Sequence, residues 1–168
     1  MKPLDQSDIK RALVNVTQSE RAAVAFEQPY ADIPWQVLDF YGWRDPKKPQ
    51  LGYLVREQGD RLVGVAVRAP ETRMSFGRKA MCTICRAVDT ANSIALFAAR
   101  RAGPAGRKGD TVGTYICAGL DCSAQLRRPT NKIGRGMLSD NDQLLDPDEL
   151  AEAMLDRLDA FLDSVIVR

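Results

Sequence analysis

The chain has 168 residues, enough for one domain or a compact pair of subdomains that buries roughly two thirds of its unfolded surface without disulfides. Hydrophobic residues make up 45% and charged residues 27%, a balance that excludes wholesale disorder and a fibrous repeat. No apolar run reaches the roughly 20 residues of a membrane span, and the first ten residues lack the apolar core of a signal peptide. We therefore expect a cytoplasmic protein with no membrane partner, and a monomer, because no long heptad pattern demands self-association.

The formal net charge of +2 hides a segregation of charge along the chain. Residues 1–72 hold 10 basic and 10 acidic residues, residues 73–135 hold 12 and 3, and residues 136–168 hold 2 and 9. The basic middle segment predicts an anionic partner, either a nucleic acid or an acidic protein surface. A solvated surface with internal charge pairing is the alternative explanation.

Two short helices, or one helix with a break, are expected at the start of the chain. Asp5 or Ser7 can cap a first helix, whose apolar residues are spaced for one buried face: Ile9, Leu13 and Val14. Thr17 and Glu20 form the T-x-x-E signature of a capping box, which predicts a second helix start.

Residues 28–50 are rich in proline and aromatic side chains and are expected to form an ordered, irregular segment. Trp43 is expected to anchor the core at a turn, which Arg44 and Asp45 hold by local hydrogen bonds. Aromatic side chains can also stack on the bases of single-stranded nucleic acid. The acids and prolines of this segment, and its distance from the basic block, argue against that use.

Alternating or β-branched apolar runs predict four strands. Residues 51–57 and 62–68 are separated by the turn residues 58–60, a pattern typical of a hairpin. Two further strands are expected at residues 92–99 and 111–116.

The remaining segments are expected to be loops and helices. A loop of glycine, proline and basic residues covers positions 100–110, a helix begins near residue 120, and a loop covers positions 129–146. Pro147 stands where proline is favoured at a helix start. The last helix is expected to cover the hairpin with one apolar face, formed by Leu150, Met154, Leu158, Phe161, Leu162 and Val165.

The four cysteines stand in two close pairs, Cys82 with Cys85 and Cys117 with Cys122. In a reducing compartment, such pairs are more often metal ligands than disulfides. A tight turn brings both sulfurs of a C-x-x-C pair to about 2.3 Å from one ion. The second pair places one cysteine at a strand end and the other in the first turn of a helix. Knuckle, hairpin and helix, in this order, are the parts of a treble clef.

This pattern predicts one structural zinc ion with four cysteine ligands. Four thiolates fill a tetrahedral shell and leave no position for a water molecule or a substrate. Iron in a rubredoxin-like site and a redox C-x-x-C pair are alternatives, although a redox pair does not explain the second pair of cysteines.

The residues that most enzymes use for catalysis do not stand out in this chain. It has no histidine, and it contains no G-x-S-x-G, Walker A or G-x-G-x-x-G motif. Catalysis would require a pocket of perturbed carboxylates or lysines, which a sequence does not reveal. We therefore expect a binding module and not an enzyme.

Several motifs follow one another in a specific order. Residues 42–46 read Gly-Trp-Arg-Asp-Pro, the first hairpin ends near Val-Gly-Val at residues 63–65, and an arginine follows the first cysteine pair. Residues 113–117 then read Gly-Thr-Tyr-Ile-Cys and precede Asp-Cys-Ser at residues 121–123. In these motifs the chain resembles the C-terminal treble-clef zinc-finger domain, called the FBP domain, of elongation factor G-binding proteins of the FusB fusidic acid resistance type.

The resemblance spans roughly residues 5–165 and implies an α+β fold, in which a treble-clef zinc finger combines with a small antiparallel hairpin or sheet packed by N- and C-terminal helices. We expect a single FBP-type domain over residues 1–168. Residues 1–72 would supply helices, an aromatic loop and a hairpin, residues 73–135 the basic finger, and residues 136–168 a loop and an acidic helix.

The resemblance also implies a partner, either elongation factor G or a ribosome-associated translation factor, and a role in releasing that factor from the ribosome. FusB-type proteins carry a helical domain ahead of this one, which we do not expect in a chain of 168 residues. Binding of ribosomal RNA or DNA is the alternative function. From charge and exposure, we expect partner contacts around the knuckle and the hairpin tip, at Arg78, Lys79, Arg86, Arg100, Arg101, Arg107 and Lys108.

Overall fold

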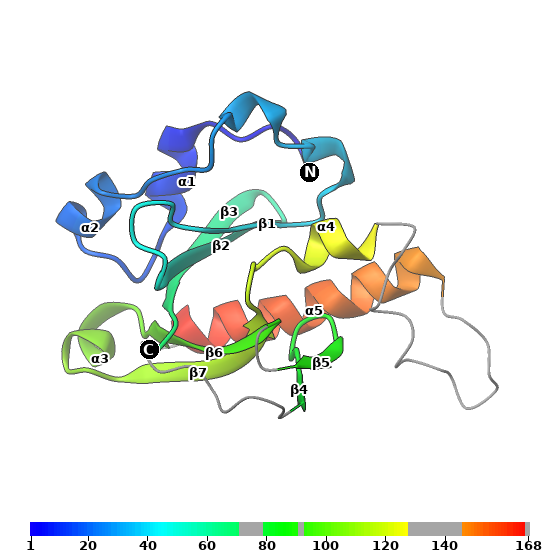
Figure 1. Cartoon of the computed structure of the whole chain (residues 1–168). Helices are drawn as coiled ribbons and strands as arrows, with labels where there is room; N and C mark the ends of the chain where they lie inside the picture. Colours follow the sequence, from blue (N-terminus) through cyan, green and yellow to red (C-terminus); the bar gives the residue numbers. More distant parts are fainter. Residues whose placement is uncertain (71–78, 91–92, 128–145, 167–168) are drawn as a thin grey trace.

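The computed structural model describes residues 1–70, 79–90, 93–127 and 146–166. Its centre is an antiparallel sheet of five strands in the order β1-β2-β3-β6-β7, accompanied by a ribbon of β4 and β5. The strands are β1 (Tyr41–Arg44), β2 (Leu51–Gln58), β3 (Arg61–Arg68), β4 (Lys79–Met81), β5 (Val88–Thr90), β6 (Ile94–Arg100) and β7 (Thr111–Cys117). Helices cover this sheet on two sides, so the fold is α+β, as the sequence predicts (Figure 1).

The helices are short except for the last one. They are α1 (Gln6–Ala12), α2 (Gln18–Ala22), the 3₁₀ helices η1 (Tyr30–Asp32) and η2 (Trp35–Val37), α3 (Gly103–Arg107), α4 (Cys122–Leu126) and α5 (Pro147–Ile166). No helix in the described parts of the chain is long and apolar enough to cross a membrane.

The first two helices start at the predicted caps. The Asp5 carboxylate accepts a hydrogen bond from the Ser7 N–H at 2.7 Å, and Thr17 and Glu20 form a complete capping box. After α1, the N–H of Val14 donates to the carbonyl of Gly64 at 3.0 Å. The N-terminal segment is therefore attached directly to β3.

The predicted hairpin is confirmed as β2 and β3, which pair from Leu51↔Arg68 to Gln58↔Arg61. Gly59 has a positive φ of 58° in the connecting turn, a conformation that glycine adopts without steric cost. The β6–β7 hairpin is also confirmed, with pairing from Ile94↔Cys117 to Arg100↔Thr111.

Two hydrophobic cores share the sheet. One core lies between α5, the four cysteines and inward side chains of β2, β3, β6 and β7. Figure 1 shows α5 running beside the sheet, with β1, β2 and β3 above it and β6 and β7 below. All six predicted residues of the apolar face of α5 are buried, which confirms that this helix closes the core.

The second core is aromatic and lies under the N-terminal segment. Trp43 is completely buried between Phe26 and Tyr41, whose rings stack on it at 5.3 and 4.6 Å. Its indole N–H donates to the carbonyl of Ala25 at 2.9 Å. The Asp45 carboxylate accepts hydrogen bonds from three donors of the adjoining turn and strand: the N–H groups of Lys47 and Lys48 and the hydroxyl of Tyr53. Trp43 is thus the predicted core anchor.

Some elements differ from the sequence prediction. The strands β1, β4 and β5 were not predicted, because three or four residues are too short to show a period of two. The loop predicted at residues 100–110 contains α3, and the helix predicted from residue 120 begins at Cys122 because Leu120 has a positive φ of 60°. The loop predicted at residues 129–146 lies almost wholly outside the described residues.

Candidate metal centre

The first cysteine pair lies in a tight turn between β4 and β5. The N–H of Arg86 donates to the carbonyl of Cys82 at 2.9 Å, and the N–H of Cys85 donates to the Cys82 sulfur at 3.4 Å. Arg86 closes the turn with a positive φ of 61°. This turn is the predicted knuckle, and the N–H of Thr83 fixes it to β7 by donating to the carbonyl of Tyr115 at 2.7 Å.

The second cysteine pair joins β7 to α4. Cys117 is the last residue of β7, the N–H of Leu120 donates to its carbonyl at 2.8 Å, and Cys122 is the first residue of α4. This turn packs tightly against β1, because a Cβ on Gly42 would lie 2.2 Å from the carbonyl oxygen of Leu120. Only glycine permits such a close approach of two backbones.

The four sulfurs have the geometry of a tetrahedral zinc site. All lie within 4.8 Å of one another, with separations of 3.7 Å between Cys82 and Cys122 and 3.5 Å between Cys85 and Cys117. Metal–sulfur bonds of about 2.3 Å in a tetrahedron place the sulfurs about 3.8 Å apart. All four side chains are buried. The predicted ligands therefore come together as one zinc site with four cysteine ligands.

Electrostatics in this site favour a divalent cation. Hydrogen bonds with the sulfurs of Cys117, Cys82 and Cys85, and then burial, raise the pKa of the Cys122 thiol well above its usual range. Burial disfavours the charged form of a thiol, and four buried thiolates would repel one another unless a cation lies between them. The guanidinium of Arg157 adds positive charge nearby and donates from Nε to the carbonyl of Ile84 in the knuckle at 2.7 Å.

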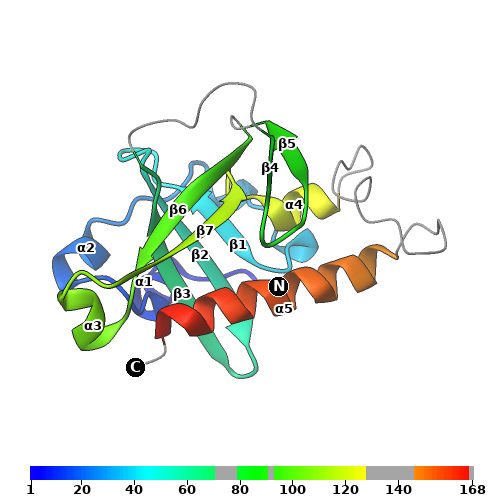
Figure 2. The ribbon, with the colours of Figure 1, turned by 90° about the horizontal axis from the view of Figure 1, so that it is seen from below.

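The predicted partner-binding residues fall into two groups. Lys79 and Arg86 flank the knuckle, while four residues lie at the far end of the β6–β7 hairpin: Arg100, Arg101, Arg107 and Lys108. The strands between them span seven residues, or about 20 Å. Figure 2 shows α3 at one end of β6 and β7 and the β4–β5 ribbon near the other end. Arg78 lies outside the described residues.

Internal ion pairs neutralise part of the positive charge of residues 73–135. Arg100 pairs with Glu20 at 2.6 Å, and Arg101 pairs with Asp110 at 3.1 Å. Arg127 bridges two acids of different segments, Asp39 and Asp148, at 2.9 and 2.8 Å. Three arginines of the basic segment, residues 73–135, are therefore paired with acids of the same chain.

Sequence analysis missed an exposed apolar surface beside the metal site. Met81 and Val88 are register partners in the β4–β5 ribbon, and Leu96 and Tyr115 are register partners in β6 and β7. Their exposed fractions are 46%, 55%, 37% and 39%. We call these four residues the finger surface. From Leu96 onward burial alternates, with Phe97 and Ala99 buried and Leu96 and Ala98 exposed. Residues 94–99 are all apolar, so no alternation in the sequence marks the side of β6 that faces outward.

Comparison with known proteins identifies the family. The family model of the FBP C-terminal treble-clef zinc-finger matches residues 8–165, nearly the whole chain. Searches of curated proteins and of solved structures gave no significant match. The matched range contains all four metal-ligating cysteines, the Gly42-to-Pro46 motif and the two hairpins. The chain therefore belongs to the FBP C-terminal treble-clef zinc-finger family.

Proposed function

We propose that this zinc finger is a protein-binding module that binds elongation factor G and promotes release of the factor from the ribosome, without catalysing a reaction. The resemblance of its motifs to those of elongation factor G-binding proteins supports this partner. The chemistry of the zinc site supports a structural role, because four sulfur ligands leave no open coordination position for a substrate.

The finger surface is the observation that carries the protein-binding part of this proposal. The two exposed apolar pairs lie on adjoining elements, because Thr83, two residues after β4 ends, donates its N–H to the carbonyl of Tyr115. Neighbouring exposed apolar side chains are typical of protein interaction sites. The N–H of Thr83 holds the knuckle against Tyr115, so the zinc site fixes the position of the β4–β5 ribbon relative to β7. Lys79 is exposed on β4 and Arg86 is half-buried beside it, so an acidic rim on the partner would complement this surface.

Nucleic acid binding is supported less well. A phosphate-binding face requires free cations along one continuous surface. Here Arg100, Arg101 and Arg127 are engaged in internal ion pairs, and the remaining described cations of the segment lie at two ends of a hairpin. The apolar finger surface beside the knuckle suits a protein partner better.

A binding titration of the zinc-loaded chain with purified elongation factor G tests the proposal. We expect a complex at micromolar concentration, weakened at least about tenfold by the paired substitutions Leu96→Ser and Tyr115→Ser, because aromatic anchors dominate binding energy. Val37→Ser is the matched control, since Val37 is 49% exposed and lies on η2, outside the finger surface. Thermal melts of each variant separate lost binding from lost folding.

Two results would contradict this proposal. The absence of a complex at micromolar concentration removes elongation factor G as the partner, whereas equal weakening by Val37→Ser removes the finger surface as the binding site. A parallel titration with ribosomal RNA at several salt concentrations tests the alternative. Binding through phosphates weakens with a log–log slope of about −0.7 to −0.9 per neutralised phosphate, and a flat response excludes it.

A further inference from the structure

The sheet opens between β3 and β6, and one side chain fills the gap. These two strands have a single register pair, Arg68↔Ala98. If this antiparallel register continued, Val67 would pair with Ala99 and Ala66 with Arg100. Instead, the Asn15 amide lies between them: it accepts from the Ala66 N–H at 2.8 Å and donates to the carbonyls of Ala66 and Arg100, both at 2.9 Å. Asn15 therefore replaces the missing strand pairing.

A cavity of about 260 Å³ lies beside Asn15, between the N-terminal segment and the sheet. Residues with apolar side chains make up much of its lining: Val16, Leu51, Tyr53, Ala66 and Ala98. The Asn15 side chain is 5% exposed and uses its carbonyl oxygen and both amide hydrogens in the strand bridge. The lining is thus held in a fixed shape by β2, β3 and β6.

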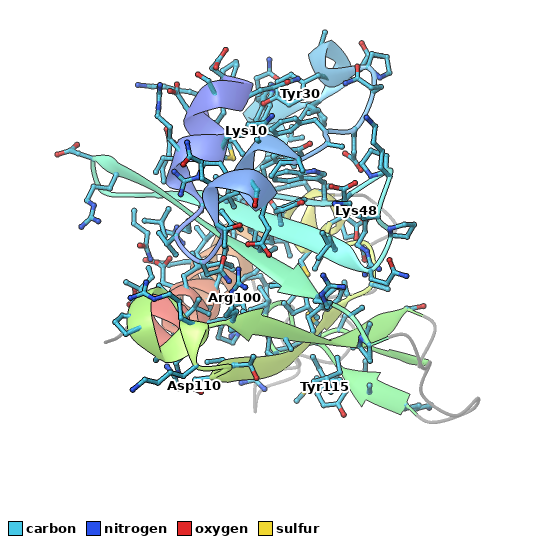
Figure 3. The ribbon with its side chains drawn as sticks, turned by 90° about the vertical axis from the view of Figure 1, so that its left-hand side faces the viewer. Lys10, Tyr30, Lys48, Arg100, Asp110 and Tyr115 are labelled. Carbon is cyan, nitrogen blue, oxygen red and sulfur yellow. The ribbon has the colours of Figure 1, made fainter. Side chains whose placement is uncertain are left out.

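The charge around this cavity is predominantly positive. Lys48, Arg68 and Arg100 line it, with Glu20 as its single lining acid among the described residues. Arg100 is held in place by the Glu20 carboxylate at 2.6 Å and the carbonyl of Asn15 at 3.1 Å. Lys48 and Arg68 are exposed and form no ion pair within the described parts of the chain. Figure 3 shows Lys48 and Arg100 on the same face of the molecule.

We propose that this cavity binds a carboxylate carried on a short apolar or aromatic group, with the carboxylate against Lys48 and Arg68 and the apolar group on the lining of β2, β3 and β6. Small-ligand sites typically combine an apolar lining with a few polar groups that orient the ligand. A neutral apolar ligand would leave the two cations unused. A cationic ligand would be repelled by the net positive rim.

This site is separate from the proposed binding of elongation factor G. The residues that line the cavity include none of the four residues of the finger surface. A carboxylate of this kind can belong to a free organic acid or to a glutamate side chain flanked by apolar residues in a protein. One probe for each source distinguishes the two.

The zinc-loaded chain is titrated with benzoate at low salt, and amide shifts are followed by ¹H–¹⁵N NMR. We expect saturable shifts at residues around Asn15, Arg68 and Ala98, because these residues line or frame the cavity. Benzyl alcohol and benzylamine have the same ring without the negative charge and should bind at least about tenfold more weakly. A capped peptide, acetyl-Leu-Glu-Leu-amide, tests a carboxylate carried on a protein.

Variants separate this site from general charge effects. Lys48→Met with Arg68→Met should weaken binding about tenfold or more, and Ala98→Leu should block the cavity without altering charge. The control is Lys2→Met with Arg61→Met, which removes the same charge at exposed residues outside the cavity. Binding of benzoate or of the peptide supports the site and identifies its source. Binding of neither probe, or equal loss in the control, overturns the proposal.

Discussion

Substitution of one zinc ligand should unfold the finger and with it much of the larger core. In Cys117→Ser, a hydroxyl replaces a thiolate that lies 3.5 Å from the Cys85 sulfur. Structural zinc contributes apparent binding free energies of about 10–16 kcal/mol in small fingers, whereas a whole domain is stable by about 5–15 kcal/mol. Complete loss of the metal would therefore remove a free energy comparable to the total stability of the chain.

The structure indicates which parts should be lost first. The four cysteines belong to the core that α5 closes, whereas Trp35 and Trp43 belong to the aromatic core. Removal of zinc acts directly on the knuckle, α4 and the end of β7. Tryptophan fluorescence reports on the aromatic core, which contacts the zinc site through the packing of β1 and β2 on Leu120. It is therefore expected to change after helical circular dichroism, to which α5 contributes most.

The assay combines elemental analysis for zinc with thermal unfolding followed by both signals. We expect one zinc ion per chain in the parent protein, less than one in Cys117→Ser, and a fall in melting temperature of more than about 20 °C or no cooperative transition. Thr83→Ser is the control, because Thr83 is exposed in the same knuckle and provides no ligand. A zinc-free Cys117→Ser variant that melts within about 3 °C of the parent would refute a structural role for the metal.

Three further substitutions test the arrangement around the sheet. Asn15→Ala should lower the free energy of unfolding by about 2–3 kcal/mol, measured by urea denaturation, because three partly buried backbone groups lose their partner. An unchanged midpoint contradicts the strand bridge. Arg86→Gly should raise the free energy of unfolding by about 0.5–1 kcal/mol in the same assay, because glycine adopts the positive φ of the knuckle without strain. A lower free energy of unfolding contradicts this explanation. Hydrogen bonding to the Thr17 backbone, and further contacts with Arg100, lower the pKa of Glu20 below 4.5. The stability difference between parent and Glu20→Gln should therefore be present above pH 4.5 and disappear as the pH falls through the lowered pKa, and a difference that grows in acid contradicts the sign.

The metal site and the longer elements could be predicted because their signals are local. Cys82 and Cys85 are separated by two residues, and the apolar spacing of α5 persists over five turns. The hairpins also contain their own turn residues, as at Gly59. Each of these patterns needs only neighbours in the sequence, so tertiary contacts did not have to be known.

The features that were missed depend on contacts between distant residues. Asn15 stands between two valines and has no local motif, yet its partners Ala66 and Arg100 lie 51 and 85 positions away. The separation of the basic residues into two groups follows from the length of β6, which carries Arg100 about 20 Å from the knuckle. A count of charges along the sequence does not show that the two groups of basic residues lie this far apart.

Contacts between distant motifs explain why the order of the motifs identifies the family better than the four cysteines alone. Gly42 and Gly52 lie on neighbouring strands, and a Cβ on either would collide with Leu120 in the turn between the last two ligands. The Ser123 hydroxyl, directly after Cys122, accepts a hydrogen bond from the N–H of Asp39 at 2.6 Å. The segment before β1, the first two strands and the second half of the zinc site are therefore one packed unit. Zinc holds the turn at Leu120, and that turn packs on β1 and β2. Loss of the metal should therefore also loosen the cavity lined by Leu51 and Tyr53. Both proposed binding sites thus require the metal-loaded chain.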